Sequence, residues 1–155
     1  MSEATPFALS KLFTHLTGHQ VSVSQAVKPL ERKATQLYGE YVVLPWERAL
    51  VVEMDLSLLS ALGGALLGLP SAVALQKAQE KPMDALVQDA IQEVLNVASA
   101  VLSKEGRVVF RKLVVDRIYL STECTVLLTK ASVRAFFQVA IDGRSEGFFS
   151  MMTNL

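Results

Sequence analysis

The sequence predicts an α+β fold in which long helices pack on one largely antiparallel sheet. Two segments, 56–67 and 82–104, have the periodicity and end signals of helices, and the second half of the chain is rich in β-branched and aromatic segments. No low-complexity linker divides the 155 residues. A chain of this length forms one domain and buries about two thirds of its unfolded surface. We therefore expect a single domain over residues 1–155.

The composition limits the kinds of partner and site. With 51% hydrophobic and 19% charged residues, the chain needs a sizeable core or a subunit interface. Fifteen basic and fifteen acidic residues leave no net charge, which disfavours nucleic acid as a partner. Cys124 is the only cysteine, so we expect a small buried side chain and no disulfide or thiolate zinc site. His15 and His19 are four residues apart without a nearby third ligand, so no metal site is predicted.

The first elements follow from their end signals. Pro6 in a first turn and Gly18 after the last apolar residue predict a helix over 3–17. No basic leader precedes a hydrophobic run, so we expect a cytoplasmic protein without a secretory signal. Val21 and Val23 alternate with polar neighbours, which is typical of a strand.

Residues 40–54 are rich in valine, tyrosine and leucine, and they predict two strands with a turn around 45–47. Tyr41 and Trp46 lie on either side of that prolyl turn. We expect them at a strand edge packed on the first helix, with a surface contact site as the alternative.

The stretch 56–75 has no charged residue and is about as long as a membrane span. However, Gly68 and Pro70 end a helix early, and Asp55 is placed to cap its start. A short buried helix over 56–67 is therefore predicted, and no membrane span. Association with a membrane through this stretch is the weaker alternative, and cell fractionation would test it.

The rest of the chain predicts a connection, a helix and a set of strands. We expect a connection over 69–81 and a second helix from Pro82 to Lys104, with Gly106 just past its end. Asp142 and Gly143 suit a hairpin turn. The predicted strands around them are 107–116, 118–122, 124–130, 133–141 and 147–152. Adjacent phenylalanines at 136–137 and 148–149 place an aromatic ring on each strand face, which predicts cover on both faces of the sheet, by a second subunit in one interpretation.

Three polar residues share one narrow arc of the second helix. At about 100° per residue, Asp89, Glu93 and Asn96 lie within about 60° of each other, opposite the apolar side, and Gln92 extends the polar surface. Two carboxylates four residues apart repel each other by a few tenths of a kcal/mol. Periodicity alone indicates only the solvated face of an amphipathic helix.

The spacing Asp89-x-x-x-Glu93-x-x-Asn96 resembles the motif [Asp/Ser]-x-x-x-Glu-x-x-Asn of CheC, CheX and FliY, the chemotaxis phosphatases that act on phosphorylated CheY. The segment DALVQDAIQEVLNVASAVLS is similar to the motif helix of that family, and VVEMDLSLLSALGGALLG is similar to the strand and helix that precede it in CheX. The resemblance covers about residues 5–152. It implies a CheC/CheX-like fold, a pseudo-repeat of two halves.

The resemblance also implies roles. Asn96 would orient a water for attack on the aspartyl phosphate of a CheY-like receiver domain, and Glu93 would pair with the lysine of that receiver. Asp89 would support the helix face or contact the same partner, and Gln92 would contact that partner. The Mg²⁺ belongs to the receiver, so the chain would need no metal or cofactor of its own.

A single-site, CheX-like member is the expectation, because Ala61 and Gly64 stand where the helix of the first half would carry glutamate and asparagine. This implies a homodimer. Gly63 and Gly64 would let another helix approach closely. The family motif continues with a proline in the strand after the helix, and 107–120 contains none. The alternative is therefore a non-catalytic CheC-like module that binds a chemotaxis, signalling or motor partner.

Overall fold

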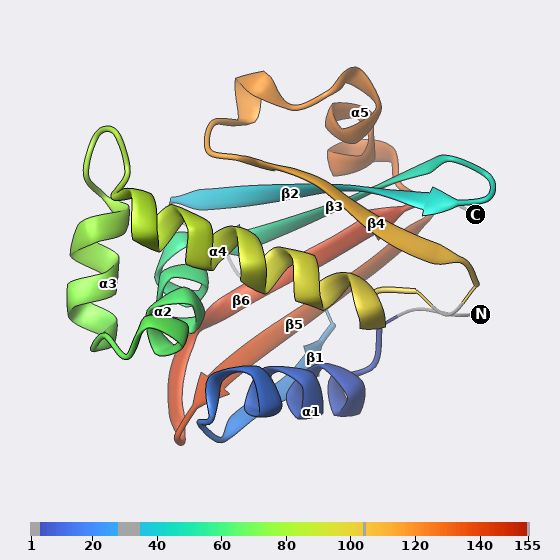
Figure 1. Ribbon diagram of the computed structural model, residues 1–155. Helices are drawn as coiled ribbons and strands as arrows, with labels where there is room; N and C mark the ends of the chain where they lie inside the picture. Colours follow the sequence, from blue (N-terminus) through green and yellow to red (C-terminus); the bar gives the residue numbers. More distant parts are fainter. Residues whose placement is uncertain (1–3, 28–34, 104, 155) are drawn as a thin grey trace.

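One six-stranded antiparallel sheet forms the centre of the structure, a computed structural model that describes residues 4–27, 35–103 and 105–154 (Figure 1). Its strand order is β1-β5-β6-β3-β2-β4. The strands are β1 (Val21–Ala26), β2 (Gln36–Leu44), β3 (Arg48–Asp55), β4 (Arg107–Val114), β5 (Val133–Ile141) and β6 (Arg144–Thr153). The helices are α1 (Pro6–Thr17), α2 (Leu56–Leu67), α3 (Ser71–Ala78), α4 (Ala85–Ala98) and α5 (Thr122–Lys130), with short 3₁₀ turns η1 (Ser99–Val101) and η2 (Arg117–Tyr119). The predicted α+β class is confirmed.

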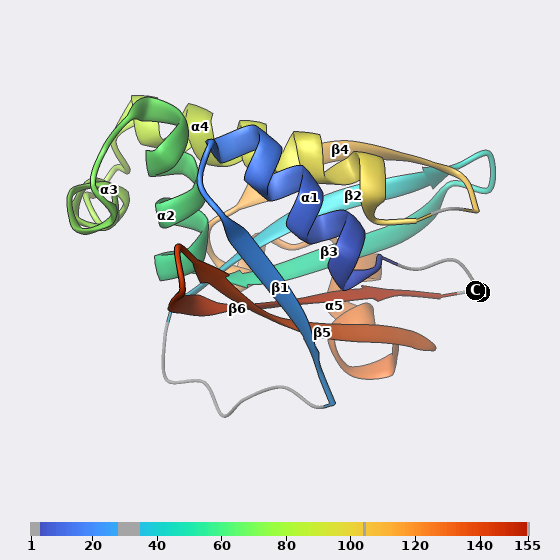
Figure 2. The ribbon, with the colours of Figure 1, turned by 90° about the horizontal axis from the view of Figure 1, so that it is seen from below.

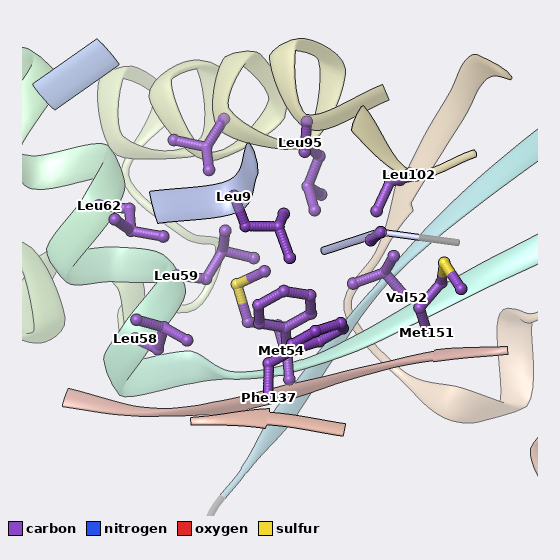
Figure 3. Packing of buried hydrophobic residues seen from close by; sticks show 14 of the residues in the cluster. Leu9, Val52, Met54, Leu58, Leu59, Leu62, Leu95, Leu102, Phe137 and Met151 are labelled. Carbon is purple, nitrogen blue, oxygen red and sulfur yellow. The ribbon is translucent and has the colours of Figure 1, made fainter. Parts of the chain in front are cut away.

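Helices α1, α2 and α4 cover one face of the sheet, and α5 covers part of the other face (Figures 1 and 2). In the main core, leucines from the three helices point toward Met54, Phe137 and Met151 of the sheet (Figure 3). The Phe137 and Phe149 rings stack with centroids 4.8 Å apart. On the second face, Cys124 and Leu127 of α5 pack with side chains of β2, β3 and β6. The sheet is therefore covered on both faces, and α5 of the same chain provides the second cover.

The first helix also protects an edge of the sheet. Thr5 caps α1 by accepting a hydrogen bond from the Ala8 N–H, and Gly18 ends the helix in the left-handed region at φ 74°. The N–H groups of Val21 and Val23, on the outer edge of β1, donate to the hydroxyls of Thr14 (2.9 Å) and Ser10 (2.8 Å). This edge is thus closed to strand pairing by side chains of α1.

Glycines in α2 allow the helices of the main layer to pack closely, as the sequence predicted. A Cβ on Gly63 would lie 3.2 Å from Ile91 Cγ1 of α4, and a Cβ on Gly64 would lie 2.5 Å from the Cβ of Ala74 in α3. Helix α2 is largely buried. Within the described residues, no single helix is long and apolar enough to cross a bilayer. Helices α2 and α3 reach the necessary length and hydrophobicity only together, and the chain bends by 115° between them.

Three sequence predictions about helices are corrected. The connection over 69–81 contains helix α3. The helix expected over 82–104 begins at Ala85, because the Asp84 side chain caps it by accepting from the Val87 N–H (3.1 Å). This helix ends at Ala98 and is followed by η1. Lys104, its expected last residue, lies outside the described residues. Asp55 occupies the N-cap position of α2, but its carboxylate accepts hydrogen bonds from the Gln36 side chain and the Phe148 N–H instead of capping the helix.

The strands predicted over 118–122 and 124–130 are wrong. The first segment forms η2 and a short connection, and the second forms α5. Ser121 caps α5 by accepting from the Cys124 N–H (3.2 Å), and its own N–H donates to the buried Glu40 carboxylate (2.8 Å). Glu40 thus takes the place that a glutamate within the helix has in a capping box. The hydrogen bond from Ser121 to Glu40 of β2 thus favours a helix over 122–130, although the β-branched residues of that segment favour a strand.

The substitution Gly64→Ala should lower the free energy of unfolding by about 1–3 kcal/mol, because the new methyl group meets the rigid Cβ of Ala74. Urea denaturation measures the change. Adding Ala74→Gly should recover part of the loss, since it removes the opposing methyl group. A Gly64→Ala variant as stable as the wild type would contradict the close packing of α2 and α3.

Cys124 should be a poorly reactive thiol in the native protein. Its side chain is buried, and burial raises the pKa of the thiol to about 11, so that roughly one molecule in a thousand is ionised at pH 8. Ellman's reagent should therefore label it much more slowly in buffer than in 6 M guanidinium, to be read as absorbance against time. The control, Thr125→Cys in a Cys124→Ser background, places an exposed thiol on the same helix and should react within the mixing time. Equal rates for both thiols would contradict the buried position.

Candidate functional site on helix α4

Helix α4 is held to the rest of the molecule by its apolar side and by one buried hydrogen bond. The buried residues of the helix are Val87, Ala90, Ile91, Val94, Leu95 and Ala98. The Tyr41 hydroxyl donates to the Leu95 carbonyl at 2.6 Å. Burial raises the pKa of Tyr41, so the hydroxyl stays protonated and remains a donor. Tyr41 therefore packs beneath α4, and the expectation that it packs on the first helix is wrong.

A change of helix geometry explains why the Leu95 carbonyl is free to accept. The Ser99 N–H bonds to the carbonyl of Asn96, as η1 begins, instead of the carbonyl four residues before it. The Leu95 carbonyl then lacks its helical donor, and a buried carbonyl without a partner would destabilise the fold. Tyr41 supplies that donor from β2 and attaches the end of α4 to the sheet, one residue from Asn96.

Asp89, Glu93 and Asn96 lie on the exposed side of α4, directed away from the sheet, and Gln92 beside them is half-buried. With positions four and three residues apart, their side chains are neighbours on the helix surface. Neither carboxylate nor the carboxamide makes a hydrogen bond or ion pair with another described residue. Leu86, 67% exposed, continues the same face toward the start of the helix. The structure thus presents two carboxylates and an amide to solvent on a well-packed helix.

This group of residues suits contact with another protein better than metal binding. The amide of Asn96 is both a donor and an acceptor, and carboxylates accept from lysine or arginine. Among the described residues, no group of three or more histidine, cysteine, aspartate or glutamate side chains is placed to hold a metal ion. His15 is exposed, whereas His19 Nδ1 lies 2.8 Å from Asp142 Oδ2. That hydrogen bond lowers the pKa of Asp142 and joins the α1–β1 connection to the β5–β6 turn.

The equivalent positions in the first half of the chain cannot form a second polar face. Ser57 donates to the Glu146 carbonyl (3.1 Å), Ala61 is buried, and Gly64 is covered by Ala74 of α3. An asparagine side chain at position 64 would have no room, because its Cβ would lie 2.5 Å from the Cβ of Ala74. The sequence predicted one candidate site from residue types alone, and α3 adds a steric reason for the absence of the second.

A separate groove of about 1050 Å³ runs along α1, lined by Phe7, Leu12 and Val101 among others. Its lining is mostly apolar, and it carries no pair of carboxylate and amide groups like that of α4. We therefore assign the candidate site to α4 and not to the larger concavity.

Comparisons with known proteins agree with this architecture. No protein-family model matches the sequence, and no curated protein sequence does. Among solved structures, the FliM middle domain from H. pylori matches with a TM-score of 0.61 and 13% identity, over 96% of this chain and 84% of that chain. FliY from Thermotoga maritima matches with a TM-score of 0.58 and 11% identity, over 93% and 81% of the two chains. A chain of the H. pylori FliG–FliM complex gives 0.58 and 10%, over 98% and 87%.

The chain has the fold of the FliM middle domain and of FliY. The predicted resemblance to the CheC, CheX and FliY family is thereby confirmed at the level of the fold. Domains that share this fold can have different functions. Two residues that position α4 in this FliM-like fold were not predicted from the sequence, Asp84 and Tyr41. Asp84 is the cap of α4 and Tyr41 is the buried hydrogen-bond donor to its end. Asp84 could have been predicted, because a capping residue type stands just before an apolar periodic segment, whereas the position of Tyr41 in the sequence gives no such signal.

Replacing Tyr41 with phenylalanine should lower the free energy of unfolding by about 1–3 kcal/mol, because the buried Leu95 carbonyl loses its donor. The control is Gln76→Ala at an exposed position of α3, where the change should stay within about 0.5 kcal/mol. Urea denaturation gives both values, and hydrogen exchange of the α4 amides should rise in Tyr41→Phe. Equal stability of the two variants would contradict the proposed attachment of α4.

Proposed function

We propose that this domain docks a phosphorylated receiver domain through the polar face of α4 and accelerates hydrolysis of its aspartyl phosphate. The observation that carries the proposal is the exposure of Glu93 and Asn96, side by side and unpaired among the described residues, on a helix whose opposite side is fully packed. The spacing of these residues with Asp89 supports it, because it resembles the motif of phosphatases that act on phosphorylated CheY.

The chemistry requires positioning of a water molecule and little else. The water oxygen attacks phosphorus in line with the acyl phosphate bond, that bond breaks to regenerate the aspartate carboxylate, and the water proton leaves with inorganic phosphate. Asn96 would accept from this water and orient it, which lowers the entropic barrier. Glu93 would pair with a lysine of the receiver, and Asp89 and Gln92 would contact its surface. The receiver would supply the Mg²⁺, and the chain would need no cofactor.

The setting of this reaction is part of the proposal. Receiver domains act in the cytoplasm, so we place this domain there, with a receiver of CheY type as its partner. The homodimer implied by the resemblance to CheX stays a prediction.

A non-catalytic binding module is the second candidate. Two observations favour it. The chain has the fold of the FliM middle domain, and a similar chain comes from a FliG–FliM complex. The strand after α4 lacks the proline of the phosphatase motif. In that case the same face of α4 would bind a signalling or motor partner without turnover.

The decisive assay follows phosphate release from a panel of phosphorylated receiver domains. The wild type should accelerate release, and Asn96→Ala should reduce the acceleration by about 10²-fold through loss of water positioning, with little change in affinity. Glu93→Gln should weaken binding more than turnover, because it removes one partner of an ion pair. Gln76→Ala, at an exposed position of α3, is the control and should behave as the wild type.

Two outcomes separate the candidates. Binding to a receiver without faster phosphate release would refute the phosphatase and leave the binding module. Full activity in Asn96→Ala would show that the motif does not carry the reaction, whichever receiver is used.

A further inference from the structure

The connection between β4 and α5 exposes three large apolar side chains within five residues. Val115, Ile118 and Tyr119 are 53%, 76% and 70% exposed. Single exposed apolar residues are ordinary, but a group of them within five positions is typical of an interaction surface. We name residues 115–119 the β4–α5 knob.

The knob is an ordered structure and not a loose loop. Asp116 Oδ1 accepts from the Ile118 N–H (3.1 Å), and the Tyr119 N–H donates to the Asp116 carbonyl (2.9 Å). Leu120 follows as a buried anchor, and the Ser121 N–H donates to the buried carboxylate of Glu40. Side chains presented on a fixed backbone lose little entropy when they are buried by a partner.

A cleft of about 420 Å³ lies on the same side of the sheet, between α5 and the β2–β3 turn. Its apolar lining includes Ala49, Leu127 and the 45% exposed Val126, and Glu47 and Glu123 lie at its rim. We name it the α5 cleft. In both views of the ribbon, the β4–α5 connection and the β2–β3 turn lie on opposite sides of α5 (Figures 1 and 2).

The two surfaces carry complementary charge. Arg111, Lys112 and Arg117 lie in or just before the knob and are exposed, with Asp116 as the one acidic residue of 111–119. The exposed carboxylates at the cleft are Glu47 and Glu123. Its one cation, Arg48, already lies near Glu105 (3.6 Å) and stacks over the Trp46 ring (4.7 Å).

We infer that the β4–α5 knob of one copy of this chain inserts into the α5 cleft of a second copy. Because knob and cleft flank α5 on the same face, the contact forms twice in a closed two-fold dimer. Apolar side chains fill the apolar cleft, and Arg117 faces the carboxylates at its rim. Helix α4 lies on the opposite face of the sheet and remains exposed in this dimer. The inference does not depend on the proposed phosphatase activity.

Sedimentation equilibrium over a range of protein concentrations tests the interface. The wild type should form dimers, and Ile118→Asp should weaken the dimer by at least about 30-fold in Kd, since a charge replaces a buried anchor. The matched control is Phe7→Asp, at a side chain of α1 that is 77% exposed, and it should dimerise as the wild type does. Thermal unfolding followed by circular dichroism confirms that both variants are folded.

Charge reversal tests the pairing itself. Arg117→Glu and Glu123→Arg should each be monomeric alone, because each places like charges in contact. An equimolar mixture of the two variants should dimerise. In the mixed dimer, the knob of Arg117→Glu meets the cleft of Glu123→Arg with opposite charges, and the second contact keeps the native pair of Arg117 and Glu123. A wild type that stays monomeric at every concentration, a dimer that Ile118→Asp leaves intact, or a mixture that stays monomeric would each overturn the inference.

Discussion

The contact of α2 with α4 at Gly63 determines how the helical layer is arranged. A Cβ at this position would lie 3.2 Å from Ile91 Cγ1 and 3.3 Å from the Ile91 backbone nitrogen, so glycine lets the two helices come this close without a shift of either one. The approach turns Ile91, Val94 and Leu95 into the core, where they meet leucines of α1 and α2. Among the residues that the structure describes, no element packs on the opposite side of α4. Exposure of Asp89, Glu93 and Asn96 follows from the packing on the other side.

The sheet separates two surfaces with different chemistry. The face of α4 is acidic and polar, and the bond from Tyr41 to the Leu95 carbonyl fixes the helix next to Asn96. The β4–α5 knob and the α5 cleft lie on the other side, where apolar side chains are exposed beside basic residues of the knob and acidic residues of the cleft. Such a division allows one side to hold a second copy of the chain while the other contacts a signalling partner.

Much of this fold could be predicted from local patterns. The period of the apolar residues identified α4 and its polar arc, and Asp142–Gly143 forms the expected turn, with φ angles of 51° and 78°. Helix α5 could not be found this way, because its β-branched residues favour a strand and its helix depends on Glu40, which is distant in the sequence. The contact of Tyr41 with Leu95 spans 54 positions and left no local signal. The shared exposed face of Asp89, Glu93 and Asn96 was predictable from their spacing, and their role as a site stays a prediction. That Gly64 is covered by Ala74 of α3 could not be predicted, because helix α3 itself was not.

The central claim is that the exposed face of α4 is the surface that meets a receiver domain. Amide chemical-shift mapping tests it most directly, with a receiver held in its phosphorylated-like state by beryllofluoride and Mg²⁺. The account predicts that the largest perturbations fall on residues 86–100, with little change in α3 or in the β4–α5 knob. Perturbations confined to other surfaces, with α4 unchanged at saturation, would contradict it.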